Sequence, residues 1–344
     1  MKIMQKHIGH QSKQRGFIVL LIMMMLVVGA AVWFGTISGL RAQNMQIQMH
    51  NMHIRELHQI KQKMLTFAVM QPEIYYSEIS GSPDFDEIPG IGYFPCPDKN
   101  GNGLPNDGFD IDGIPIAGVV NNCGSSDGFV TGIVPIKSSD NRYTFVDNPI
   151  DSNLYWFSVD SRFVTSNSIS THRFLPLNSI SPANANLTVD GRNDIVMVLF
   201  YAGDPLAGQN RSSLSQSNYL DQGNADDDEN FFTKDGAPDV FNDYVISITL
   251  EEWRAALLSR VSKDVTKDDD GDGIADDDNN NDLPDRGGNN VPDLCESNRV
   301  KDNANHWFNR CAFIAGSADF IGDCDLSALE DNFNGQNWHE FFCE

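Results

Sequence analysis

The hydrophobic and polar residues follow different patterns along this chain, and the first pattern is a long apolar run. From Phe17 to Leu40 no residue is charged and most are apolar. As a helix rising about 1.5 Å per residue, this run covers roughly 36 Å, which exceeds the hydrocarbon core of about 30 Å in a bilayer. The pattern therefore predicts a helix that spans a membrane.

Basic residues lie mainly before the run, with Lys2, Lys6, Lys13 and Arg15 ahead of it and Arg41 behind it. By the positive-inside rule, the N-terminus then stays in the cytoplasm and residues 42–344 are exported. The alternative is a cleaved secretory signal, whose apolar region would be about 7–15 residues and would end at small residues. Because Val32, Trp33 and Phe34 continue the run past its small residues, we expect a retained anchor.

The next stretch, residues 42–70, contains no Gly or Pro and is rich in good helix formers. Its apolar residues recur near helical spacing, at Met45, Met49, Met52, Leu57, Ile60, Met64, Leu65 and Ala68. This is the pattern of an amphipathic helix, which we expect to end before Pro72. Together, residues 17–70 predict one long helix whose first half is apolar and whose second half is amphipathic.

The middle of the chain has the short apolar and aromatic runs that are typical of strands. The runs are residues 155–159, 195–201 and 244–249, with 132–136 as an edge segment because it contains Pro135. Thr249 and Glu252 form a capping box ahead of a short helix at 253–261. The expected fold is α+β, with a long N-terminal helix packed against an antiparallel sheet.

Composition narrows the possible partners. The formal net charge of −24 argues against nucleic acid as a partner. The chain has no Gly-x-Ser-x-Gly elbow, no His-Glu-x-x-His motif and no complete P-loop after Gly203. We therefore expect neither catalysis nor a small-molecule substrate.

All six cysteines lie in the part expected to be exported, and an even number in an oxidising compartment predicts three disulfides. They are Cys96, Cys123, Cys295, Cys311, Cys324 and Cys343. We expect Cys96 to pair with Cys123, because both lie in one loop-rich segment, and the other four to pair among themselves. No Cys-x-x-Cys occurs, which disfavours a zinc site.

Two segments have the oxygen-ligand spacing of a calcium loop. The second segment is rich in carboxylates, at Asp268, Asp270, Asp272, Asp276 and Asp278, with Gly273 at the sharp turn. The first segment has fewer charges and places Asp98, Asn100 and Asn102 ahead of Gly103. We expect structural Ca²⁺ at the second segment. The first is equally compatible with a cluster of Asn/Gly turns, and the alternative for the second is a solvated acidic linker.

The N-terminal region resembles that of type IV prepilins and pseudopilins, in its basic stretch Lys13–Arg15, Gly16, Phe17 and the long apolar helix. The resemblance implies that prepilin peptidase cleaves after Gly16 and methylates Phe17. Most pilins carry Glu at the fifth mature position, where this chain has Leu21. Large K-type minor pseudopilins also lack that Glu, are placed at a filament tip and carry calcium in the head.

Further segments resemble large prepilin-like proteins of unassigned role. They are Tyr93–Asp98, Asn122–Gly124, Ala202–Arg211, Asn218–Leu220 and Phe241–Asp243. The implied function is a minor subunit that initiates or caps a type IV pilus or type II secretion filament, with other pilins or pseudopilins as partners. The implied location is the bacterial inner membrane, with a periplasmic head, or a pilus outside the cell. The alternative is a singly anchored, calcium-stabilised surface binding or adhesion protein.

These patterns divide the chain into five expected regions. They are a leader at 1–16, the long helix at 17–70, a β-rich head at 71–263, an Asp-rich calcium segment at 264–294 and a Cys-rich tail at 295–344.

Overall fold

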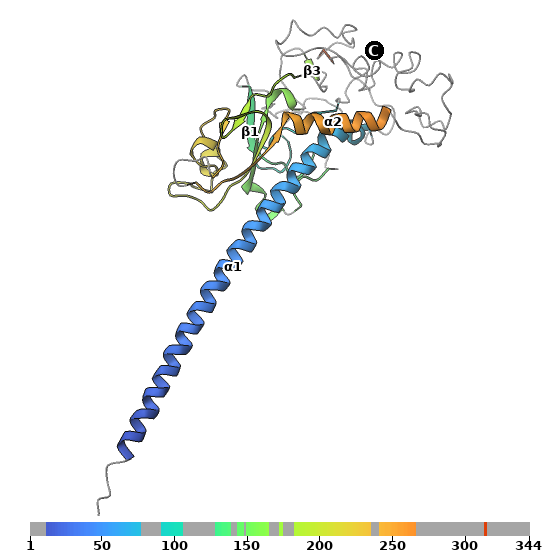
Figure 1. The fold of residues 1–344 in the computed structure, drawn as a ribbon. Helices are drawn as coiled ribbons and strands as arrows, with labels where there is room; N and C mark the ends of the chain where they lie inside the picture. Colours follow the sequence, from blue (N-terminus) through green and yellow to red (C-terminus); the bar gives the residue numbers. More distant parts are fainter. Residues whose placement is uncertain are drawn as a thin grey trace, which may run out of the picture. The chain divides into compact units, whose positions relative to one another are not determined.

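The structure of the chain is a computed structural model, and contacts divide it into two compact units, Met1–Arg55 and Glu56–Glu344. The residues that the structure describes are 12–76, 91–105, 128–138, 143–147, 149–164, 172–174, 182–234, 241–265 and 313–314. In the first unit the described residues belong to one helix. The second unit contains the end of that helix and a head built around a sheet (Figure 1).

Helix α1 runs over Ser12–Tyr76 and extends beyond the expected helix at both ends. The prediction that it stops before Pro72 is wrong, and the contacts of Ala68 explain why. Proline lacks an N–H and cannot bond the carbonyl four residues earlier, which is that of Ala68. The N–H of Gly92 donates to this carbonyl instead, at 2.7 Å. The oxygen that Pro72 leaves without a helical partner is therefore satisfied from outside the helix.

The expectation of a membrane-spanning helix is overturned. Among the described residues, no helix combines the length and hydropathy that crossing a membrane requires. The predictions of a single-pass inner-membrane location and a periplasmic head depended on that helix and fall with it.

The head is built on a six-stranded sheet in the order β1-β2-β5-β4-β6, with β7 also paired to β5. Its strands are β1 (Phe129–Ile133), β2 (Tyr155–Asp160), β4 (Leu187–Val189), β5 (Arg192–Tyr201), β6 (Asn230–Phe231) and β7 (Tyr244–Thr249). The neighbouring pairs are antiparallel except β4 and β6, which are parallel. The sheet is therefore mixed, which corrects the expectation of a purely antiparallel one.

Shorter elements complete the described part of the head. They are the 3-10 helices η2 (Pro149–Leu154), η3 (Ser161–Phe163), η4 (Gln216–Asn218) and η5 (Gln222–Asn224), helix α2 (Leu250–Val265) and a separate strand pair, β3 (His172–Phe174) with β8 (Phe313–Ile314). The expected capping box is present. Thr249 N donates to Glu252 Oε2 at 3.0 Å and Glu252 N donates to Thr249 Oγ1 at 3.1 Å.

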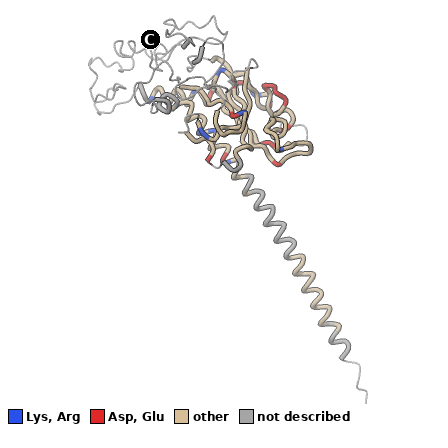
Figure 2. The backbone as a smooth tube through the Cα atoms, turned by 180° about the vertical axis from the view of Figure 1, so that it is seen from behind, with Lys and Arg blue, Asp and Glu red and all other residues tan. Residues whose placement is uncertain are grey.

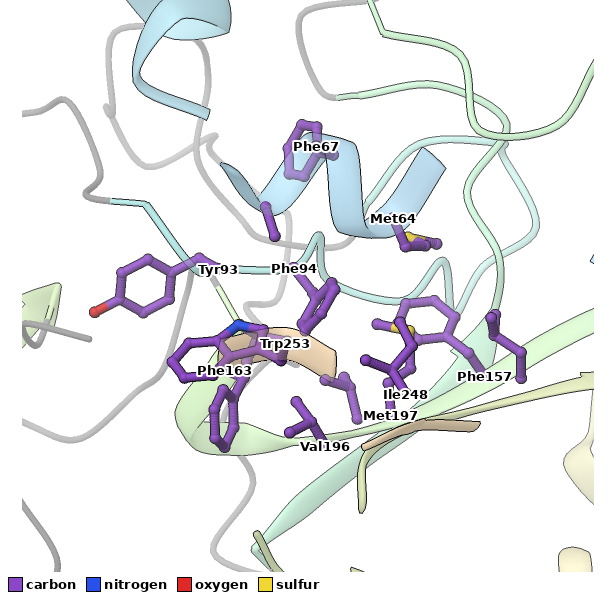
Figure 3. Close-up of a cluster of buried hydrophobic side chains, with 14 of the residues drawn as sticks. Met64, Phe67, Tyr93, Phe94, Phe157, Phe163, Val196, Met197, Ile248 and Trp253 are labelled. Atoms are coloured by element: carbon purple, nitrogen blue, oxygen red, sulfur yellow. The ribbon is translucent and has the colours of Figure 1, made fainter. Parts of the chain in front are cut away.

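One face of the sheet is covered by helices. Side chains of β2 and β5 on this face, such as Phe157 and Leu199, are fully buried. They belong to one core with Leu57, Ile60, Met64 and Phe67 of α1 and with Trp253, Leu257 and Val261 of α2. Figure 3 shows Met64 and Phe67 lying over Phe157, Met197, Ile248 and Trp253. The apolar residues of α1 from Leu57 onward are therefore buried in the head.

The opposite face of the sheet is covered by the segment between β5 and β7, whose described residues contain no α-helix. The alternate residues of the same strands, Trp156, Val198 and Phe200, pack in a second core with Tyr219, Leu220 and Phe231. These last three residues lie in the segment between β5 and β7. We call this segment, residues 203–243, the excursion. Its attachment decides whether the second core stays closed to water.

Candidate functional site

Three segments that are distant in sequence meet where the excursion leaves and rejoins the sheet. They are 202–211, which follows β5, 218–224 around η4 and η5, and 241–243, which leads into β7. Their side chains form a polar network, which we call the excursion network. Its members are Gln209, Arg211, Asp221, Asn224, Asn242 and Asp243.

The centre of the network is a pair of carboxylates, each of which accepts hydrogen bonds from the backbone next to the other. Asp243 Oδ2 accepts from the N–H of Asp221 at 2.8 Å. Asp221 Oδ2 in turn accepts from the N–H groups of Asn242, at 2.7 Å, and Asp243, at 3.3 Å. Both residues are only 1% exposed. The two ends of the excursion are therefore joined through buried carboxylates, each of which accepts from the other's chain segment.

Amide side chains extend this network on both sides. Gln209 Nε2 donates to Asp221 Oδ1 and to the carbonyl of Leu220, both at 3.1 Å. Asn224 Nδ2 donates to Asp243 Oδ2 at 3.1 Å, and its Oδ1 accepts from Phe232 N at 2.9 Å. Asn224 is fully buried. Each amide thus ties one carboxylate to the backbone of the excursion.

One cation lies beside the pair. Arg211 Nη2 donates to the carbonyl of Gly203 at 2.7 Å, and its guanidinium stacks 4.6 Å from the centre of the Tyr219 ring. Such stacking of a guanidinium on an aromatic face is favourable. Asn242 Nδ2 donates to the carbonyl of Asp204 in a short hydrogen bond. These contacts close the start of the excursion against its end.

The charges of the network are not balanced. The pKa of the Asp243 carboxyl is raised to about 7. Burial is the largest cause and the negative charge of Asp221 adds to it, while the hydrogen bonds from Asp221 N and Asn224 and the positive charge of Arg211 act in the opposite direction. Within the described residues, Asp243 Oδ1 and Arg211 Nε are buried without a hydrogen-bond partner. A protonated Asp243 carboxyl is therefore favoured well above the usual range for aspartate.

The sequence did not reveal this site. The resemblance to prepilin-like proteins covers Ala202–Arg211, Asn218–Leu220 and Phe241–Asp243, but no motif or spacing marks Asp221 and Asn224. A weak indication exists, because Asp221 directly follows the apolar residues Tyr219 and Leu220 and a carboxylate in such a place needs buried partners. Which partners it would find could not be read from spacing, since they lie up to 22 positions away.

The first expected calcium loop is a series of turns around Asp98. Asp98 is buried, and its carboxylate accepts from the N–H groups of Asn100 at 3.1 Å, Gly101 at 2.7 Å and Gly103 at 2.6 Å. Asn100 and Asn102 likewise turn their side-chain oxygens to the backbone, accepting from Asn102 N and Leu104 N. This is a series of side-chain-bonded turns, the alternative considered for this segment.

Calcium at this segment stays a prediction. Nowhere in the described ranges do three or more His, Cys, Asp or Glu side chains gather where they could hold a metal ion. Burial is also the main cause that raises the pKa of the Asp98 carboxyl, against the lowering effect of its backbone hydrogen bonds. Three N–H groups of the loop stabilise it by donating to the Asp98 carboxylate.

A pocket of about 360 Å³ lies beside this loop, on the face of the sheet that the excursion covers. Its lining includes Lys99, Thr131, Trp156, Leu214 and Asp227. Thr131 Oγ1 and Ser158 Oγ are 2.6 Å apart on the adjoining strands. The volume falls in the range of small ligand sites.

The remaining predicted site residues fall partly outside the described residues. Gly16 and Phe17 lie inside α1, and Phe17 is 67% exposed. The aspartates of the second calcium segment, at 268, 270, 272, 276 and 278, lie outside the described residues, so calcium there stays a prediction.

The cysteines are described at one position only. Cys96 is fully buried and disulfide-bonded. Cysteines 123, 295, 311, 324 and 343 lie outside the described residues. No disulfide has both of its cysteines in the described ranges, so the expected pattern of three disulfides is not seen there, and the pairing of Cys96 with Cys123 stays a prediction.

Comparison with known proteins adds no relative. The chain matches no family model, no curated protein and no solved structure.

Proposed function

We propose that this chain is a structural subunit that assembles with similar subunits through the apolar part of α1, as pilins and pseudopilins do. The observation that carries the proposal is the exposure of that part. From Phe17 to Trp33 the described large apolar side chains are between 44% exposed, at Leu21, and 70% exposed, at Met25. A helix that is apolar on every side is stable only when other apolar groups cover its surface and exclude water from it.

Other copies of the same helix are a suitable covering. No charge interrupts α1 between Phe17 and Trp33 (Figure 2). Helices of equal length and uniform apolar character can pack side by side without leaving a buried charge or an unpaired polar side chain. Three residues in this stretch, Gly29, Ala30 and Ala31, are small. Several copies would bury each other's apolar surface, and the free energy of that burial would drive assembly.

The end of the same helix supports a structural role. Leu57, Ile60 and Met64 are at most 1% exposed and belong to the main core of the head. A force or displacement applied to the helix would therefore be carried by packed core residues rather than by a loop. Cleavage by prepilin peptidase after Gly16 remains part of the proposal, and it would make Phe17 the first residue of the assembling helix.

The test is self-association of the full chain carrying a charge in the apolar stretch. Two copies of the chain with different affinity tags are produced in the same cells. One copy is purified through its tag, and the amount of the other copy that purifies with it is measured. We expect the unchanged copies to purify together and Val27→Lys to reduce this at least tenfold, because a buried ammonium is costly. Met52→Lys, which changes a residue that is 43% exposed beyond the stretch, is the matched control. Equal recovery with Val27→Lys would contradict the proposal.

A further inference from the structure

The excursion network has a property that helix assembly does not use. Its two carboxylates are buried together, with one guanidinium beside them and with one carboxylate oxygen, Asp243 Oδ1, lacking a hydrogen-bond partner among the described residues. Two negative charges buried beside each other, in a site with little water, repel each other strongly. One of the two carboxyls gains by holding a proton.

We propose that the pair of Asp221 and Asp243 is a proton-binding site that keeps the excursion closed on the sheet in acid and releases it as the pH rises to neutrality. The proton sits on Asp243, because Oδ1 of that residue is the carboxylate oxygen of the pair that no hydrogen bond reaches within the described structure. Both carboxylate oxygens of Asp221, in contrast, accept hydrogen bonds.

The surroundings of the pair decide the direction of the effect. The ionisable groups that act on Asp243 are Asp221, which opposes its ionisation, and Arg211, which favours it. Arg211 already donates to Gly203 and stacks on Tyr219, so its charge is shared with other contacts. The remaining neighbours of the pair, Asn224, Asn242 and Gln209, are neutral. Removing the proton therefore adds a negative charge that its surroundings do not neutralise.

The link between proton and opening follows from the two states of Asp243. In the closed state burial raises its pKa to about 7, whereas in an open, hydrated excursion the pKa is that of ordinary aspartate, about 3.9. Between these values opening releases a proton, so the opening constant rises by up to about tenfold per pH unit. The closed state is most favoured over the open state below about pH 4. It becomes less favoured as the pH rises to about 7, and the equilibrium changes little above that pH.

Opening would expose a defined surface. Tyr219, Leu220 and Phe231 form the covering of the second core, and all three are at most 4% exposed when the excursion is closed. The first core, which contains the ends of α1 and α2, does not include them. The inference is thus independent of the proposed assembly through α1. A local opening leaves the helical side of the head intact.

The experiment is hydrogen exchange of the full chain, followed by mass spectrometry, at about pH 5 and about pH 7.5. After correction for intrinsic exchange, we expect opening of peptides from 205–232 to rise at least tenfold between the two values, while peptides of β2 and β5 change less. Asp243→Asn, which is neutral at both values, should remove the pH dependence. Asp204→Asn, which changes an exposed carboxylate of the same segment, should leave it unchanged.

Two results would overturn the proposal. One is the same pH dependence in Asp243→Asn as in the unchanged chain, and the other is no pH dependence in the unchanged chain. A second measurement guards against failure of the variant to fold. In the unchanged full chain labelled with ¹³C at aspartate carboxyls, one resonance should titrate near pH 7. Titration of every aspartate below about pH 5 would contradict the inference.

Discussion

The indole Nε1 of Trp253 donates a hydrogen bond to the carbonyl oxygen of Gly92 at 2.9 Å. The N–H of the same glycine donates to the carbonyl of Ala68 in α1 at 2.7 Å. One peptide segment thus connects α2 to α1 across the main core of the head. Trp253 is fully buried, and its ring meets Phe163 edge-on with centroids 4.9 Å apart. This contact fixes both helices on the same face of the sheet.

Two replacements of Trp253 should separate the contributions of its hydrogen bond and of its buried ring to the stability of the head. Trp253→Phe keeps most of the apolar volume and loses the hydrogen bond to Gly92, so we expect a cost of about 1–3 kcal/mol from the unpaired carbonyl and the smaller ring. Trp253→Ala should cost about 3–5 kcal/mol. Chemical denaturation measures both. Leu258→Ala, at a position that is 36% exposed on the same helix, is the control and should cost under about 1 kcal/mol.

The capping box of α2 makes the head sensitive to acid. Hydrogen bonds from Lys61 and from Thr249 outweigh partial burial and lower the pKa of Glu252. A lowered pKa in the folded state means that the contribution of Glu252 is present above its unfolded pKa and is lost as the pH falls through the folded one. We expect Thr249→Ala to cost about 1 kcal/mol at neutral pH. Glu252→Gln should flatten the loss of stability in acid, whereas Glu251→Gln, one position away, should not.

The ion pair of Asp160 and Arg162 is buried where β2 ends and η3 begins. Arg162 Nη2 lies 2.6 Å from Asp160 Oδ2, and the two side chains are 7% and 0% exposed. Asp160 also accepts from Asn186 N at 2.9 Å, which holds the segment before β4. Removing the arginine would leave a buried carboxylate without its counter-charge. Such a loss is worth about 3–5 kcal/mol.

We therefore expect Arg162→Met to lower the free energy of unfolding by that amount, and the double change Asp160→Asn with Arg162→Met to restore part of it. Lys63→Met is the matched control, because it breaks an ion pair with Asp147, whose side chain is 70% exposed. That change should cost under about 1 kcal/mol. Equal losses for Arg162→Met and Lys63→Met would show that burial does not determine the strength of these pairs.

The positions of the strands and helices could be predicted from the sequence better than the contacts between them. The strands at 155–160, 192–201 and 244–249 and the helix after Thr249 lie close to where their patterns placed them. The end of α1 was misplaced because the partner of the Ala68 carbonyl, Gly92, lies 24 positions away along the chain. The parallel pairing of β4 with β6 was likewise hidden, since each strand is too short to carry a pattern.

The candidate site was harder to predict than the fold. Asp98 has the spacing of a calcium ligand, and in the structure its oxygens accept from the backbone of its own loop, which its place in a cluster of Asn and Gly turns could suggest. Asp221 and Asp243 have no motif spacing, and only the path of the excursion brings them together. Spacing along the sequence reports local turns well, whereas a buried pair depends on the whole topology.

The most direct test of the proposed assembly through α1 is the N-terminal sequence and mass of the mature protein isolated from cells that produce it. Assembly as a pilin-like subunit requires removal of the residues before Phe17, so that the exposed apolar helix begins the chain. We predict N-methylated Phe17 as the first residue. A chain that still begins at Met1, or that is cut after Trp33, would contradict the account.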